Sequence, residues 1–274
     1  GIHYFSPVER MLLVEVIMGK ETSQETLAKT MDYVQKIKKT PIVVNDSRGF
    51  YTSRVFGTYT GEGVAMLTEG INPALIENAG KMTGMPMAPL ALSDAVALDL
   101  AWKVTTQTQK DMEAEGKEYP ITPMHKILEE MVEKQGRYGK KNNKGFYEYP
   151  ENGKKFLWPE LSNLCKQADE QPDAEELKKR FLYIQALETA KCYEEGVLTD
   201  VRDADVGAIL GWGMAPWTGG PLSFIDMIGI KEFVAEADKL AQKYGERFTP
   251  CKLLRDMAAK NENFHGSGKS SQAA

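Results

Sequence analysis

Apolar positions divide the chain into a short strand-rich beginning and a long helical remainder. Residues 1–5 (GIHYF) and 12–17 (LLVEVI) are rich in β-branched, aromatic and aliphatic residues and flank the Pro-containing turn SPVERM, which predicts two neighbouring strands. Residues 22–39 combine a Thr-Ser start, apolar residues at helical spacing and terminal lysines, which predicts a helix. PIVVND, at 41–46, reads as a third, buried strand. This order is typical of the end of an α/β sheet domain.

From residue 48 onward the pattern becomes helical. Apolar residues at helical spacing predict helices over 48–70, 73–84, 98–116 and 123–136. The stretch 136–158 is rich in Gly, Lys and aromatic residues, which predicts a loop with a hairpin. A second helical block is expected from about residue 173.

The second helical block repeats the first. Features of the first block return in the same order: Arg54 and the Glu-Gly pair at 69–70 recur as Arg180 and 195–196, and MAPLALSD at 87–94 recurs as MAPWTGGPLSFID at 214–226. A shared order of helix end, turn and Met-Ala-Pro step favours duplication over two unrelated helical hairpins. We therefore predict a mainly α protein with a duplicated helical domain.

Composition narrows the class of protein. With 42% hydrophobic and 27% charged residues the chain reads as globular, and its net charge of −5 argues against nucleic acid as a partner. The three cysteines are far apart without CxxC spacing, so neither a disulfide framework nor a zinc or other metal site is expected, and a reducing compartment rather than secretion is favoured. No apolar run approaches the roughly 20 residues of a membrane span.

Both ends of the chain are unusual. The first residues lack an initiator methionine and already resemble the interior of a strand, so we expect the 274 residues to belong to a longer protein. No G-x-G-x-x-G follows a predicted strand, so most of a dinucleotide site is expected to lie outside this sequence. Residues 266–274 are small and polar, which predicts a disordered tail.

Histidine is the most common general base near neutral pH, and the chain has three. His125 near the start of a charged helix and His265 beside the polar tail are both predicted to be solvated. His3 lies among Ile2, Tyr4 and Phe5 on a strand. Such a histidine is either a core residue or a candidate base.

Glu15 interrupts the apolar run LLVEVI. Burying an ionised carboxylate without a partner costs several kcal/mol, so Glu15 must be neutralised or paired. Neighbouring strands would place it opposite His3, where it would orient the imidazole as a base-orienting acid does. The alternatives are pairing with Arg10 or Lys20, or exposure on an open sheet face.

Several motifs together resemble the L-3-hydroxyacyl-CoA dehydrogenase family: GIHYFSPVERMLLVEVI, GFYTSR, KGFYEY and VLTDVRDADVGAILGWGMAPWTGGPLSFID. The similarity is strongest to the dehydrogenase part of multifunctional fatty-acid β-oxidation proteins, which carry two related helical domains. The resemblance implies that His3 is the base that takes the proton of the 3-hydroxyl group while hydride passes to NAD. It implies that Glu15 orients His3.

Four further residues follow from the resemblance. Ser6 falls at a position near the nicotinamide, and Ser53 stands where the family signature has a substrate-holding Asn. This shorter side chain puts polarisation of the substrate carbonyl in doubt. Lys141 falls where the family has a lysine close to the dinucleotide, with a solvated loop charge as the alternative. Phe224 occupies a position near the substrate in some relatives, with core packing as the alternative.

The resemblance implies four segments: the C-terminal end of a Rossmann-like NAD-binding domain (1–47), a first (48–165) and a second (166–265) helical dehydrogenase domain, and the tail. It implies an acyl-CoA substrate, a possible thiolase subunit and homodimer, and a cytoplasmic, mitochondrial or peroxisomal location. The isolated residues are expected to have little dehydrogenase activity. A rival function is a non-catalytic helical assembly module. A two-domain dehydrogenase for hydroxy acids or nucleotide sugars fits the His3 to Glu15 spacing and the repeat less well.

Overall fold

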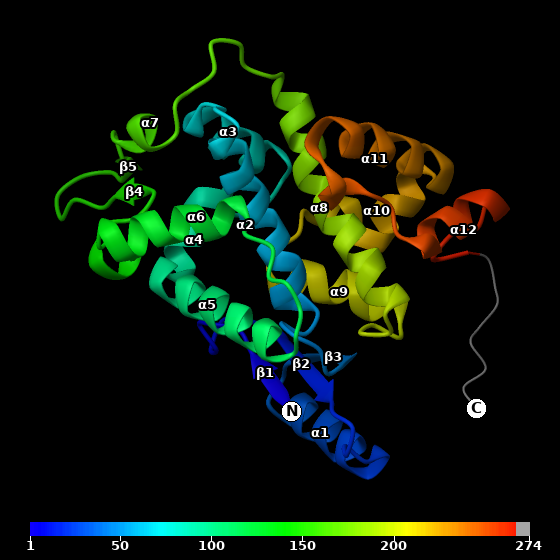
Figure 1. Ribbon diagram of the computed structural model, residues 1–274. Helices are drawn as coiled ribbons and strands as arrows, with labels where there is room; N and C mark the ends of the chain where they lie inside the picture. The colour runs from blue at the N-terminus through cyan, green and yellow to red at the C-terminus, as the bar shows by residue number, and fades with distance from the viewer. Residues whose placement is uncertain (267–274) are drawn as a thin grey trace. The chain divides into compact units, whose positions relative to one another are not determined.

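The three predicted strands form one sheet in the order β1–β2–β3 (Figure 1). In this computed structural model, which describes residues 1–266, β1 (Ile2–Tyr4) runs antiparallel to β2 (Leu13–Met18), and β3 (Thr40–Asn45) runs parallel to β2. Helix α1 (Gln24–Lys36) makes the crossover, and its N-terminus is capped by Ser23. The predicted order of strand, strand, helix and strand is confirmed. The predicted tail lies outside the described residues, apart from Gly266.

Both faces of β2 are covered, which explains its continuous apolar sequence. Val14 and Val16 pack with α1 on one face. On the other face helix α9 (Val201–Gly211) approaches closely: a Cβ atom on Gly207 would lie 2.7 Å from Ile42 Cδ1. Side chains alternate along a strand, so Glu15 points to the α9 face, away from Val14 and Val16. The carboxylate is therefore enclosed.

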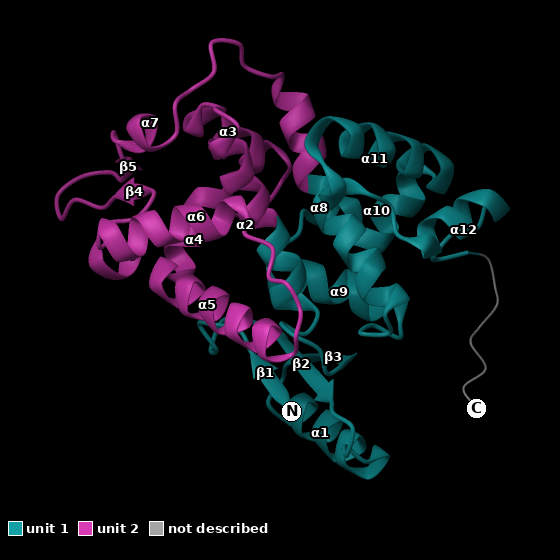
Figure 2. Ribbon diagram, in the orientation of Figure 1, with its two compact units in different colours: residues 1–58, 182–274 teal, residues 59–181 magenta. Residues whose placement is uncertain are grey.

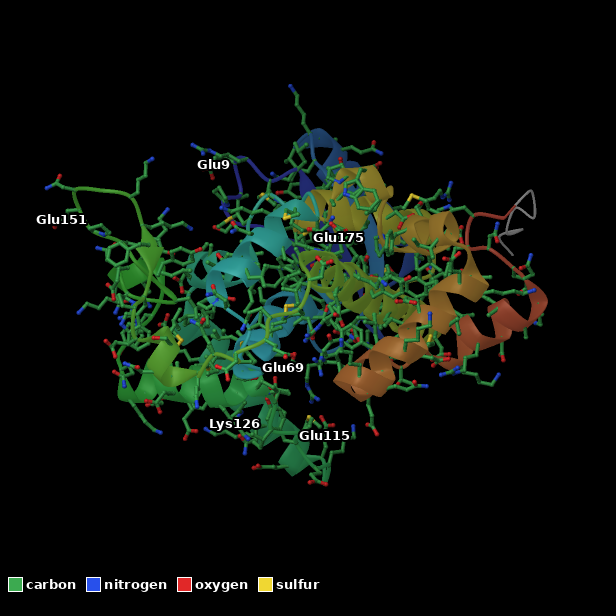
Figure 3. All side chains as sticks on the ribbon, turned by 90° about the horizontal axis from the view of Figure 1, so that it is seen from above. Glu9, Glu69, Glu115, Lys126, Glu151 and Glu175 are labelled. Atoms are coloured by element: carbon green, nitrogen blue, oxygen red, sulfur yellow. The ribbon has the colours of Figure 1, made fainter. Side chains whose placement is uncertain are left out.

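Helices make up most of the remaining chain. In order they are α2 (Thr52–Thr68), α3 (Pro73–Met82), α4 (Pro89–Val96), α5 (Leu98–Ala114), α6 (Pro123–Leu128), α7 (Leu161–Leu164), α8 (Ala174–Glu194), α9, α10 (Pro221–Ile228), α11 (Ile230–Tyr244) and α12 (Lys252–Lys260). The predicted hairpin consists of β4 (Tyr147–Glu148) and β5 (Phe156–Leu157), with Glu151, labelled in Figure 3, in its loop. No helix within residues 1–266 has the length and apolar character needed to cross a bilayer.

The chain divides into two compact units (Figure 2). Unit 1 contains residues 1–58 and the chain from Leu182 onward, and unit 2 contains Tyr59–Phe181. The division falls within α2 and α8, so each of these long helices contributes residues to both units.

An arginine with two glutamates occurs in each unit. In unit 1, Arg54 donates hydrogen bonds to Glu188 and Glu195, both at 2.5 Å. In unit 2, Arg180 is fully buried and donates at 2.7 Å to Glu62 and to Glu69, which Figure 3 labels. The residues of one set stand at a constant sequence offset from those of the other.

A second polar cluster in unit 2 joins α4 to the segment that contains β4 through hydrogen bonds to two buried carboxylates. Buried Glu77 accepts hydrogen bonds from backbone N–H groups at the start of α4 and from the Tyr147 hydroxyl, at 2.5 Å. Buried Asp94 accepts from the backbone N–H groups of Phe146 and Tyr147. Burial raises the pKa of both carboxyl groups, although the hydrogen bonds oppose this effect.

The prediction that His125 is solvated was wrong. Its side chain is buried in unit 2, with its ring 5.1 Å from that of Trp102 and 5.6 Å from that of Tyr119. The sequence around it is charged, but the aromatic rings of Trp102 and Tyr119 lie beside the imidazole.

Candidate active site

The sheet register places His3 directly opposite Glu15. The His3 Nδ1 atom lies 2.6 Å from Glu15 Oε2, with the histidine side chain 31% exposed and the glutamate fully buried. The expected contact is confirmed, and the alternative pairings of Glu15 with Arg10 or Lys20 do not occur among the described residues.

Glu15 also accepts three hydrogen bonds from the start of α2. Its Oε1 accepts from the backbone N–H groups of Tyr51 at 3.2 Å and Thr52 at 2.9 Å. Its Oε2 accepts from the Thr52 hydroxyl at 2.6 Å. The first N–H groups of a helix lack partners within the helix and attract negative charge. These donors give the fully buried carboxylate of Glu15 the hydrogen-bond partners that burial requires.

The hydrogen bond to Glu15 assigns the tautomer of His3. An ionised carboxylate can only accept, so Nδ1 carries the proton and Nε2 keeps a lone pair. The side chain is partly exposed, so a proton on a ligand can reach Nε2. The pair can therefore act as a general base whose orientation is fixed by a buried acid.

Aromatic residues surround the imidazole. The ring of Phe5 lies 4.6 Å from that of His3 and the ring of Phe50 5.9 Å, measured between centroids. Gly49 and Phe50 both have positive φ angles, +79° and +49°, in the turn that precedes α2. A left-handed non-glycine residue costs about 1 kcal/mol or more and tends to occur where function requires it.

Tyr51 anchors the start of α2. Its hydroxyl is completely buried and donates to the backbone carbonyl of Ala204 at 2.8 Å. Burial raises the pKa of Tyr51 well above its usual value, so the hydroxyl stays protonated as a donor. The turn that delivers two N–H groups to Glu15 is thereby tied to α9.

Two predicted residues lie close in sequence to this pair. Ser6 is exposed two residues after β1, and Ser53 is exposed on the first turn of α2, one residue after Thr52. Among the described residues no hydrogen bond joins Ser53 to His3 or Glu15. Its predicted substrate role stays a prediction.

Lys141 and Phe224 belong to other surroundings. Lys141 in unit 2 is 59% exposed and forms a 2.7 Å ion pair with Asp99. Phe224 in unit 1 is 3% exposed and packs edge-on against Tyr183 and Phe233, which is the core-packing alternative. The predicted binding roles of Lys141 and Phe224 stay predictions.

Tyr51 and Thr52 were missed by the sequence reasoning, although a signal was present. The residue before α2 is Tyr51, whose side chain cannot cap a helix as Ser, Thr, Asp or Asn would. A helix that lacks its own cap needs an acceptor, and buried Glu15 needs donors. Because the start of α2 needs an acceptor and Glu15 needs donors, the contact between them could have been predicted.

His265 is exposed, as expected, but its imidazole also contacts a carboxylate that the sequence did not indicate. Its Nε2 lies 2.8 Å from Oδ2 of Asp205, whose side chain is only 7% exposed. Asp205 accepts from the backbone N–H groups of Leu222 and Ser223 at the start of α10, and from the Ser223 hydroxyl at 2.6 Å. Unit 1 therefore contains a second histidine–carboxylate pair.

The His3–Glu15 arrangement is that of a general acid–base site on the edge of an α/β sheet that leads into helices. No group of three or more His, Cys, Asp or Glu residues within the described chain is arranged to hold a metal ion.

Comparisons with known proteins identify the family. Residues 1–47 match the model of the 3-hydroxyacyl-CoA dehydrogenase NAD binding domain, and residues 49–149 match that of the C-terminal domain of the same enzymes. The chain belongs to the 3-hydroxyacyl-CoA dehydrogenase family.

Solved structures show the same fold. A 3-hydroxybutyryl-CoA dehydrogenase from Escherichia coli superimposes with a TM-score of 0.73 at 22% identity, covering 95% of this chain and 70% of that one. The dehydrogenase part of multifunctional enzyme 1 from C. elegans gives 0.67 at 26% identity, covering 93% and 58%. The 274 residues thus span only part of the length of these relatives.

Proposed function

We propose that the protein is an NAD-dependent 3-hydroxyacyl-CoA dehydrogenase that interconverts a 3-hydroxyacyl-CoA and the 3-oxoacyl-CoA in fatty-acid β-oxidation. The observation that carries the proposal is the 2.6 Å contact between His3 and fully buried Glu15 in a chain of this family. Both family models name these enzymes, and both solved relatives described above are dehydrogenases.

His3 performs the proton transfer. Its Nε2 lone pair accepts the proton of the substrate's 3-hydroxyl group as the C3–H bond breaks, and the new C3=O double bond forms from the O–H electrons. The resulting imidazolium is stabilised by Glu15, which hydrogen bonds from the start of α2 hold in place. In the reverse direction His3 returns the proton to the oxygen.

NAD, when bound, supplies the acceptor for the hydride that leaves C3. Exposed Ser6, on the loop that leaves β1, fits a hydrogen bond to the nicotinamide end. The exposed ammonium group of Lys141 suits the negative charge of a dinucleotide, and it would exchange its contact with Asp99 for that role. Ser53, at the start of α2, would donate a hydrogen bond to the substrate.

We further propose that the helical part arose by duplication, as in multifunctional β-oxidation proteins. Two matched sets of contacts support this: Arg54 with Glu188 and Glu195 against Arg180 with Glu62 and Glu69, and Asp205 with Asp226, Phe264 and His265 against Glu77 with Asp94, Phe146 and Tyr147. In one copy Asp226 accepts from the backbone N–H groups of Phe264 and His265, and the His265 side chain contacts Asp205. In the other copy Asp94 accepts from the backbone N–H groups of Phe146 and Tyr147, and the Tyr147 hydroxyl donates to Glu77. A thiolase subunit and a homodimer are the partners consistent with this class.

The rival function is an assembly module in which His3 is inert. We would measure NAD reduction by the full-length protein with 3-hydroxybutyryl-CoA and longer 3-hydroxyacyl-CoA substrates. His3→Ala should lower kcat by about 100-fold or more. Turnover that survives His3→Ala would favour the assembly role, and a wild-type protein without turnover would overturn the proposed function.

A further inference from the structure

Thr52 lies at the centre of the hydrogen bonds that hold Glu15. Its side chain is 1% exposed, its backbone N–H reaches Glu15 Oε1, and its hydroxyl reaches Oε2. The hydroxyl and His3 Nδ1 bind the same carboxylate oxygen, each at 2.6 Å. We infer that Thr52 is a positioning residue for the dehydrogenase reaction and acts on His3 through Glu15.

The backbone donors hold only one of the two carboxylate oxygens. The Tyr51 and Thr52 N–H groups both bind Oε1. The terminal torsion of a glutamate side chain is broad, so fixing one oxygen still allows the other to swing. Oε2 is the oxygen that meets His3, and the Thr52 hydroxyl is the donor that fixes it in addition to the imidazole. Without the hydroxyl, the imidazole would have to follow a moving acceptor.

The stiffness of threonine suits it to this task. A β-branched side chain in a helix has few χ1 rotamers, so little freedom remains for the hydroxyl once α2 is formed. The ionised carboxylate only accepts, so the hydroxyl donates. A charge-assisted hydrogen bond of this type is shorter and stronger than a neutral one, in keeping with the 2.6 Å distance.

The inference rests on the proposed function, and the chain provides a matched control. The Ser223 hydroxyl donates to buried Asp205 Oδ2, also at 2.6 Å, and Ser223 likewise stands at the start of a helix. Its removal should cost similar stability without touching His3. Thr52→Val removes only the donor, because Val has nearly the shape of Thr. Thr52→Ser keeps the hydroxyl.

The test is steady-state kinetics of the full-length protein with 3-hydroxybutyryl-CoA and NAD. Thr52→Val should lower kcat about tenfold while KM for the acyl-CoA changes less than about twofold, since ring orientation matters most in the transition state. Thr52→Ser should recover most of the rate, and Ser223→Ala should leave kcat unchanged. An unchanged kcat in folded Thr52→Val, or an equal fall in Ser223→Ala, would overturn the inference.

Two further measurements keep the test decisive. If Thr52→Val does not fold, Thr52→Cys, which retains a weaker donor of similar size, should show an intermediate loss of kcat, and full activity would contradict the inference. The proton NMR signal of His3 Nδ1–H should broaden or move in Thr52→Val and stay in Ser223→Ala. This signal does not depend on turnover, so it tests Thr52 even if the proposed dehydrogenase activity fails.

Discussion

The pairs His3–Glu15 and His265–Asp205 are built in the same way within unit 1. Each histidine side chain is about one-third exposed, at 31% and 35%, and contacts a carboxylate that is at most 7% exposed. Each carboxylate also accepts from two consecutive backbone N–H groups at the start of a helix and from a hydroxyl at 2.6 Å.

The two pairs differ in the ring nitrogen they use and in what surrounds the ring. Glu15 binds Nδ1 of His3, which leaves Nε2 at the far tip of the ring available to a ligand. Asp205 binds Nε2 of His265, so the nitrogen that remains lies beside the residue's own backbone. The backbone N–H of His265 is bound by Asp226. A buried carboxylate partner therefore does not by itself define a catalytic histidine.

The neighbours reinforce the difference. The His3 ring lies beside the rings of Phe5 and Phe50, tilted by 48° and 51°, while the charge of His265 acts on the carboxyl group of Asp200. We interpret the first pair as chemical and the second as structural.

The largest expected contrast is in activity after neutralising each carboxylate. In Glu15→Gln an amide N–H₂ faces His3 Nδ1 and reverses the tautomer, so kcat should fall about 100-fold or more. The corresponding change Asp205→Asn should leave kcat within about twofold. Steady-state kinetics of the full-length variants measures both. Comparable losses in the two variants would remove the distinction between the pairs.

A smaller contrast is expected in stability. Asp205→Ala leaves the N–H groups of Leu222 and Ser223 without their acceptor at the start of α10, which should cost about 2 kcal/mol of unfolding free energy. His265→Ala should cost less than about 1 kcal/mol, because water replaces the partner of a partly exposed side chain. Urea unfolding gives both values. A larger loss for His265→Ala would mean that His265 supports more than this contact.

The smallest effect concerns the pKa of Asp200. The hydrogen bond from Arg202 lowers this pKa most, and the charge of His265 adds to the effect. A carboxyl group whose pKa is lowered by folding contributes stability at pH values above its ordinary pKa of about 3.9. This stability is lost as the pH falls through the pKa of the folded state. His265→Gln should raise the pKa slightly and Arg202→Gln should raise it more, as followed by carboxyl NMR titration. If His265→Gln leaves the pKa of Asp200 unchanged, the charge of His265 does not act on Asp200.

Local patterns predicted the sheet and the His3–Glu15 contact, because antiparallel strands with period-two side chains place the residues opposite each other. The same patterns predicted that α2 begins at residue 48. In the structure it begins at Thr52, because Gly49 and Phe50 have positive φ angles that a helix does not accept. Thr52 and His265 were missed as partners because their carboxylates lie far away in sequence. Only tertiary structure brings them together.

The helix expected over 123–136 shows a similar limit. It begins as α6 but continues as a π-helix from Glu129 to Lys134. Hydrophobic periodicity fixes where a helix packs, but it does not reveal a local change in hydrogen-bond spacing.

The most direct test of the account compares His3→Gln with His265→Gln in the full-length protein, assayed for NAD reduction by a 3-hydroxyacyl-CoA. Glutamine keeps a polar side chain in both places but cannot take up the proton. The account predicts that kcat/KM falls about 100-fold or more for His3→Gln and stays within about twofold for His265→Gln. Equal losses, or a larger loss at His265, would contradict the assignment of the chemistry to His3 and Glu15.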